Sequence, residues 1–270
     1  CTIGSDAFVR PQYRGRGIYN MIAKYLTSRE DLLGSMRFAF YNEITKTASG
    51  SAPLLMESSV SLKVLNPGKV STVFFGNRFK ADLASFLSSL IRGRERRKGV
   101  VQIGEGDAIG YAKFYDGWAT ENIMIHTPRT LEHLEWRFNM DPRGRPVFHS
   151  IHRGGRIVGY FVTMREETFQ THNLETLVVS DYLIENNDPE IFRDSVSEII
   201  RLNDDADMIM ARSFSSRGYQ KKLLELGFLD SMYFPLNRLI KPGGVGLRIY
   251  DYNCSGFRDM QWYLTESDCF

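Results

Sequence analysis

The hydrophobic positions near the start of the chain follow first a strand pattern and then a helix pattern. Residues 7–9, Ala-Phe-Val, predict the end of a strand, which Pro11 terminates. After Gly17, apolar residues recur at positions 18, 21, 22, 25 and 26, the spacing of an amphipathic helix. A second strand is predicted at 37–41. The first 42 residues therefore predict a strand, a loop, a helix and a strand, and 60–65 predicts a further strand.

A similar alternation returns in the second half of the chain. A hairpin is predicted over 148–164, and the glycines of Arg153-Gly154-Gly155-Arg156 place its turn. The elements predicted after it are a strand at 174–184, a helix opened by Asp188 and Pro189, a strand at 207–212, a helix ending at Gly227, a strand at 228–239, and one or two strands within 245–264. These patterns predict a first domain at 1–65, a connecting region at 66–127 and a second domain at 128–270.

Composition narrows the class of protein. The chain has 270 residues, of which 43% are hydrophobic and 24% charged, and these shares exclude disordered and collagen-like proteins. The formal charge of +2 gives no case for nucleic acid or an anionic membrane as a partner. No apolar run approaches the roughly 20 residues of a membrane span. Three scattered cysteines predict neither disulfides nor a thiolate metal site, and they favour a cytoplasmic location.

The loop before the first helix carries the chemistry. In Gln12-Tyr13-Arg14-Gly15-Arg16-Gly17, the two glycines allow a phosphate to approach the backbone at a helix N-terminus, and Arg14 and Arg16 add positive charge. A Walker A loop would end in Gly-Lys-Ser/Thr, which does not follow Gly17. A dinucleotide fingerprint would need a small residue at Asn20 and an acidic residue after the next strand, where Asn42 stands. The loop therefore predicts diphosphate binding of another kind.

The segment from Phe8 to Ile18 resembles motif A of the GNAT acyl-CoA N-acyltransferase superfamily, Gln/Arg-x-x-Gly-x-Gly/Ala. The resemblance implies an α/β fold with the mixed sheet of that family and acetyl-CoA or another acyl-CoA as co-substrate, without a metal. It also implies that Phe8 and Val9 line the pantetheine arm and that Asn42 contacts the cofactor. The residues implied to bind the pyrophosphate are Gln12, Arg14, Gly15, Arg16, Gly17 and Ile18. The tyrosine that serves as general acid in the family has no counterpart at 43–60.

The second half resembles the superfamily more loosely. The segments 134–142, 154–160 and 223–228 look like the second half of bacterial tandem GNAT proteins, so two GNAT-like domains are expected, the first incomplete. Residues 181–189 contain no glycine, and this second domain is expected not to bind CoA. A GNAT domain has three strands and two helices before motif A. Only a few residues precede it here, and the resemblance therefore implies an N-terminally truncated first domain.

These observations predict an N-acyltransferase that moves an acyl group to a primary amine of a small molecule or an amino sugar. Asp6 is a weak candidate for the general base, and the alternative is a solvated residue at a strand end. Two other functions stay open. One is a non-catalytic GNAT-like binding module, and the other is an aminoacyl transferase of the peptidoglycan-bridge type, against which the glycine loop counts. The acceptor, the acyl chain and the oligomeric state are not determined by the sequence.

Overall fold

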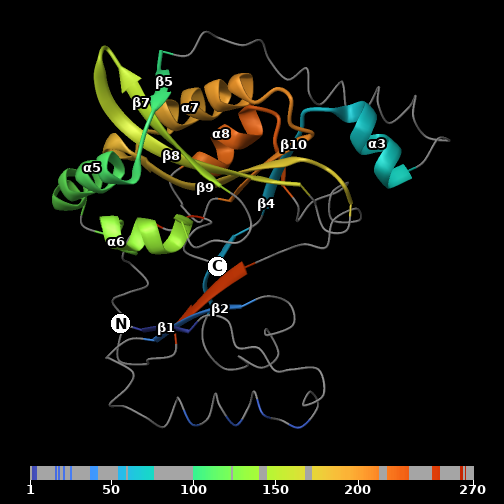
Figure 1. Ribbon diagram of the computed structural model, residues 1–270. Helices are drawn as coiled ribbons and strands as arrows, with labels where there is room; N and C mark the ends of the chain where they lie inside the picture. Colours follow the sequence, from blue (N-terminus) through green and yellow to red (C-terminus); the bar gives the residue numbers. More distant parts are fainter. Residues whose placement is uncertain are drawn as a thin grey trace. The chain divides into compact units, whose positions relative to one another are not determined.

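The computed structural model of the chain forms two compact units (Figure 1). The first unit comprises residues 1–58, 243–260 and 269–270, and the second comprises 59–242 and 261–268. The residues that the structure describes are 2–4, 16, 18, 21, 25, 37–41, 54–58, 60–75, 100–122, 124–139, 145–167, 172–212, 218–230, 245–249, 262–263 and 265.

The second unit is built on a seven-stranded mixed sheet with the strand order β11-β4-β10-β9-β8-β7-β5. Its strands are β4 (Val60–Val64), β5 (Gln102–Glu105), β7 (Pro146–Arg153), β8 (Arg156–Glu166), β9 (Thr176–Ile184), β10 (Met208–Arg212) and β11 (Leu229–Asp230). The pair β9 and β10 is parallel, and the other pairs are antiparallel. The predicted hairpin is confirmed: Gly154 and Gly155 have φ of +58° and +77°, the left-handed region that a tight turn between β7 and β8 requires.

Helices cover both faces of this sheet. They are α3 (Pro67–Phe75), α5 (Ala108–Glu121), α6 (Leu131–Leu134), the π-helical turn η3 (Glu135–Asn139), the 3-10 turn η4 (Glu185–Asn187), α7 (Pro189–Leu202) and α8 (Tyr219–Glu225). Figure 1 shows α7 and α8 beside each other on one face and α5 and α6 on the other. The unit therefore has three layers, with the sheet in the middle.

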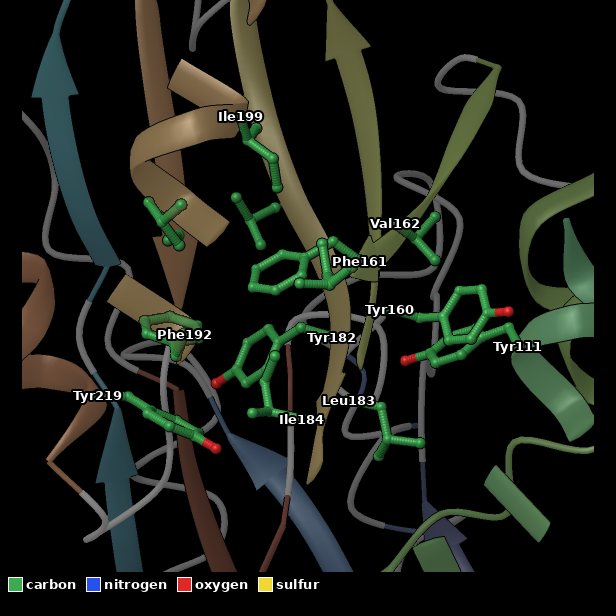
Figure 2. Close-up of a cluster of buried hydrophobic side chains, with 14 of the residues drawn as sticks. Tyr111, Tyr160, Phe161, Val162, Tyr182, Leu183, Ile184, Phe192, Ile199 and Tyr219 are labelled. Atoms are coloured by element: carbon green, nitrogen blue, oxygen red, sulfur yellow. The ribbon is translucent and has the colours of Figure 1, made fainter. Parts of the chain in front are cut away.

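Alternation along the central strands gives each face its own aromatic core. Phe161 and Tyr182 point toward α7, where both rings lie against Phe192, and Figure 2 shows them on that side. Their neighbour Tyr160 points the other way and packs against Tyr111 of α5, with ring centroids 5.4 Å apart. Because side chains alternate along a strand, β8 is buried on both faces, and this explains its long run of buried residues.

The first unit contains a four-stranded sheet with the order β1-β2-β12-β3. Its strands are β1 (Thr2–Gly4), β2 (Arg37–Tyr41), β3 (Leu54–Ser58) and β12 (Val245–Ile249). The pair β1 and β2 is parallel, while β12 is antiparallel to both β2 and β3. The predicted strand at 37–41 is confirmed with the same bounds. The predicted strand end at 7–9 lies outside the described residues.

Each sheet contains one strand that is far in sequence from the strands beside it: β12 in the first unit and β4 in the second. The order β1-β2-β12-β3 repeats the directions of β9-β10-β4-β11, in which a parallel pair is followed by two antiparallel pairings. In both sheets the third strand comes from a distant part of the chain. Strand β4 follows β3 after the single residue Ser59, yet it lies in the second unit, and β12 follows the second unit, yet it lies in the first.

The predicted domain boundaries at 65 and 128 differ from this division. Strand β4 pairs with β10 and β11, so the first segment of the first unit ends at Ser58. The described part of the predicted connecting region is not a linker, because β5 pairs with β7 and α5 buries Tyr111, Ala112, Tyr115 and Trp118. The last predicted strands exist as β12 and β13 (Trp262–Tyr263), and they belong to different units. Strand β13 pairs in parallel with β6 (Ile125–His126) in the second unit.

The start of α7 provides a local test of the helix signals. Asp188 is the N-cap, its carboxylate accepts a hydrogen bond from the backbone N–H of Glu190 at 2.8 Å, and Pro189 occupies the first turn. We expect Asp188→Ala to lower the free energy of unfolding by about 1 kcal/mol in urea denaturation, because a backbone donor loses its acceptor. Asp188→Asn keeps an acceptor oxygen, so its free energy of unfolding should fall clearly less than that of Asp188→Ala. An equal loss in both variants would assign the effect to the charge instead of the cap.

Within the described residues, no helix is long and apolar enough to span a bilayer.

Candidate functional site

The Gln12-to-Gly17 motif stands in the sequence between two parallel strands of the first unit, β1 and β2. Strand β1 pairs with β2 in the register Thr2 with Arg37 and Gly4 with Ala39. Ile18, Met21 and Tyr25, which follow the loop, are helical. Two parallel neighbours need a crossover connection, and this one contains a helix. In the sequence, the motif therefore stands after a strand and directly before helical residues, and backbone N–H groups at a helix N-terminus can bind anions.

Two of the predicted cofactor-binding residues fall within the described part of the chain. Arg16 is exposed and lies in a bend, and Ile18 is half-buried in the helix. The other predicted site residues lie outside the described residues; they are Asp6, Phe8, Val9, Gln12, Arg14, Gly15, Gly17 and Asn42. The general acid stays unassigned.

The helix after the loop differs from its prediction in one respect. Met21 and Tyr25 were expected on the apolar face, but their exposed fractions are 59% and 56%. Ile18 is half-buried. In the described residues, the buried surface of this helix is therefore narrower than the apolar pattern of the sequence predicts.

The second unit has an equivalent crossover, from β9 through α7 to β10, and its loop has a different chemistry. Residues 185–188 read Glu-Asn-Asn-Asp, and Pro189 lacks an N–H group. The carboxylate of Asp188 already occupies the first turn of α7. The hydrogen bond from Lys222 lowers the pKa of Glu190, so this carboxyl is ionised at neutral pH. The first turn of α7 thus has a carboxylate acceptor of its own, which already takes one of the N–H groups that an external anion would need.

Carboxylates in this loop also have cationic partners. Glu185 forms an ion pair with Arg156, which also donates from Nη2 to Glu185 Oε2 at 2.7 Å. Asp188 lies 3.9 Å from Arg153. These pairs join the loop to the two ends of the hairpin turn between β7 and β8. The interactions hold the loop of residues 185–188 against the hairpin turn. This structural role agrees with the expectation that the second unit does not bind CoA.

A buried polar cluster lies beside the middle of the seven-stranded sheet. Arg129 and Asp181 are each 1% exposed, and the guanidinium donates to both carboxylate oxygens at 3.2 and 3.3 Å. The hydroxyl of Thr265 donates to Asp181 Oδ1 at 2.6 Å and accepts from Arg129 Nη2 at 3.3 Å. The backbone N–H of Tyr182 also donates to Asp181. Both charges are therefore paired and hydrogen-bonded, as buried charges must be.

Sequence analysis missed this cluster, although one signal for it exists. Asp181 is the only charged residue in β9, whose nine residues are all buried. A lone carboxylate in such a strand needs a buried cation. The identity of that cation is not readable from the pattern, because Arg129 lies 52 residues earlier.

The histidines of β7 form hydrogen bonds within the sheet. Nε2 of His149 lies 2.8 Å from the hydroxyl of Thr163, and Nε2 of His152 lies 2.9 Å from that of Ser150. Burial lowers the pKa of His149, which favours its neutral form. Among the described residues, no three His, Cys, Asp or Glu side chains are grouped so that they could hold a metal ion.

Comparison with known proteins gives matches by structure. No family model matches the sequence, and no curated protein does. A GCN5-related N-acetyltransferase from Anabaena variabilis matches with a TM-score of 0.54 and 10% identity, over 90% of this chain and 53% of that chain. Saccharomyces cerevisiae N-myristoyltransferase with bound myristoyl-CoA matches with a TM-score of 0.55 and 12% identity, over 92% and 59%. A second structure of that enzyme, with myristoyl-CoA and inhibitors, gives 0.53 and 14%, over 90% and 58%.

The chain thus spans little more than half the length of these solved structures. At such low identity the likeness concerns the backbone arrangement. In this chain, that arrangement consists of a mixed sheet, a parallel strand pair joined through a helix, and helices on both faces. The fold implied by the motif at Gln12 to Gly17 is confirmed, and the chain has the fold of the GNAT N-acyltransferases.

Proposed function

We propose that this protein is an acyl-CoA-dependent N-acyltransferase. The observation that carries the proposal is the Gln12-to-Gly17 motif, which stands in the crossover between the parallel strands β1 and β2. Successive backbone N–H groups at a helix N-terminus, with exposed Arg16 nearby, suit the pyrophosphate of CoA. The solved structures with the same fold support the proposal, since they include an N-acetyltransferase and an N-myristoyltransferase with myristoyl-CoA.

The proposed reaction is direct acyl transfer to a primary amine. The amine nitrogen attacks the thioester carbonyl carbon, the new C–N bond forms, and the C–S bond breaks. A base takes the proton that the amine loses, and the CoA thiolate takes up a proton as it leaves. Asp6 is the proposed base, because a carboxylate before the motif can accept a proton from an ammonium group. The protein's main contribution would be to bind and orient both substrates.

The proposed acceptor is a small molecule with a primary amine, including amino sugars.

Two features support assigning the cofactor to the first unit. The first unit carries the glycine motif, and the start of α7 in the second unit carries Glu185, Asp188 and Glu190. One cofactor site per chain is therefore proposed, without a metal.

Calorimetry of the whole chain with acetyl-CoA tests the proposal. We expect acetyl-CoA and desulfo-CoA to bind with one site per chain. Gly17→Val should weaken binding at least about tenfold, because a Cβ branch would keep the pyrophosphate from the backbone. The matched control is Gly117→Val in α5, where an added Cβ meets no atom within 4 Å. Absence of acetyl-CoA binding, or equal affinity of Gly17→Val and the unsubstituted chain, would refute the proposal.

A further inference from the structure

The strand β12 is bracketed in the chain by two segments of the other unit. Residues 59–242 and 261–268 belong to the second unit, and 243–260 belongs to the first. Strand β12 lies between β2 and β3 and is the only described strand that pairs with both of them. Its position matters for the proposed cofactor site, because β2 is the strand at the end of the motif crossover. Residues that fix the chain just after β12 can therefore affect how stably β12 pairs with β2 and β3.

After β12 the chain re-enters the second unit at residues 261–268, here called the returning segment. The buried polar cluster of Arg129 and Asp181 fixes this segment. Tyr263 is 1% exposed, and its hydroxyl donates to the backbone oxygen of Tyr182 at 2.6 Å. Its ring lies 4.9 Å from that of Trp118, and the Arg129 guanidinium is 5.7 Å from its centroid. Thr265 is fully buried, and its hydroxyl completes the coordination of Asp181. Two side chains of the returning segment thus bond to two successive residues of β9.

The returning segment also contributes to the cluster, because Thr265 is hydrogen-bonded to both of its charged residues. Arg129 and Asp181 are both buried charges, and the Thr265 hydroxyl is hydrogen-bonded to each of them. If the segment left, the pair would lose this bridging hydroxyl and the covering ring of Tyr263. Release is therefore opposed by the loss of two hydrogen bonds to charged groups, which are stronger than hydrogen bonds between neutral groups.

Twelve residues, 250–261, separate the end of β12 from Trp262. Ordering either end restricts this stretch, so each ordered end lowers the entropy that must be lost to order the other. The docking of Tyr263 and Thr265 therefore favours the pairing of β12 with β2 through the chain that connects them.

We propose that Tyr263 and Thr265, held by the Arg129–Asp181 pair, form a clasp that keeps β12 in the first sheet and so positions the proposed cofactor site. The four residues are positioning residues, and they touch neither substrate nor cofactor. This inference rests on the proposed function only for the effect on CoA. The effect on β12 stands without it.

Hydrogen exchange of the whole chain tests the clasp. Thr265→Val removes the hydroxyl and keeps the shape of the side chain. We expect exchange at 262–265 to rise roughly 10- to 100-fold, the size of a hydrogen bond to a charged group. Exchange at 245–249 and 37–41 should rise severalfold, and the affinity for acetyl-CoA should fall severalfold. Tyr263→Phe, which removes the hydroxyl bond to Tyr182, should act in the same direction if Thr265→Val does not fold.

The matched control is Thr163→Val in β8. Thr163 is 2% exposed and bonded to His149, so the variant loses a comparable buried hydroxyl without touching the returning segment. It should leave exchange at 245–249 unchanged. Faster exchange at 262–265 with unchanged exchange at 245–249 would overturn the clasp, and so would an equal effect of Thr163→Val. A chain that binds no acetyl-CoA would refute the proposed function, while exchange at 245–249 would still decide the clasp.

Discussion

Arg129→Met is expected to lower the free energy of unfolding by about 3–5 kcal/mol, because it leaves the Asp181 carboxylate buried without its cation. Both side chains are 1% exposed, so water cannot replace the guanidinium in the folded state. The methionine is long enough to fill much of the volume, which limits the cavity. Urea denaturation, followed by circular dichroism, measures the loss.

The double variant Arg129→Met with Asp181→Leu separates charge from packing. Removing both charges should recover a large part of the loss, because no unpaired ion is left in the interior. The matched control is Arg201→Met, which breaks the exposed pair with Glu198 and should change stability little. If Arg129→Met lost no more than Arg201→Met, the buried pair would not contribute to folding.

Phe161→Ala should lower the free energy of unfolding by about 3–5 kcal/mol, the usual cost of removing a buried phenylalanine ring. Phe161 is fully buried, and its ring is stacked with those of Tyr182 and Phe192 at centroid distances of 5.6 and 5.8 Å (Figure 2). The loss would open a cavity between the central strand β8 and α7. A fall in the melting temperature and in the urea midpoint reports it.

Two variants accompany this prediction. Phe161→Leu retains most of the apolar volume and should cost clearly less than Phe161→Ala. Val147→Ala, on β7, removes a side chain that is 50% exposed and should change stability by no more than about 0.5 kcal/mol. Equal losses for Phe161→Ala and Val147→Ala would show that the aromatic layer is not the core of the unit.

Elements with strong local signals were predicted well. The turn at Gly154-Gly155 requires positive φ at both residues, which few residue pairs other than Gly-Gly, Asn-Gly and Asp-Gly adopt readily. Helix α7 begins where the capping Asp188 and Pro189 predict. The signals of α5 were present but weaker. Asp107 caps that helix, yet Gly110 and Gly117 inside it lower its intrinsic helix propensity, so a connecting region was predicted there instead.

The sheet membership of strands could not be predicted, because it depends on pairing between distant residues. Nothing in the pattern of 245–249 indicates pairing with 37–41, about two hundred residues earlier. The same holds for β4, whose alternation predicts a strand but not its partner β10. For the candidate site, the short glycine motif was enough to predict the fold. The Arg129–Asp181 pair was missed because one partner lies on a strand and the other on an irregular segment.

Because β12 belongs to the first sheet, that sheet cannot be completed during synthesis until most of the second unit has been made. Residues 1–58 leave the ribosome before β12 is made, and their sheet lacks an inner strand until Ile249 has been synthesised. At typical elongation rates of roughly 5–20 residues per second, the two hundred residues from β2 to β12 take on the order of 10–40 s. During that interval β2 and β3 have edges without their final partner, and such edges invite aggregation. A nascent chain of this protein is therefore expected to depend on chaperones that bind its early strands.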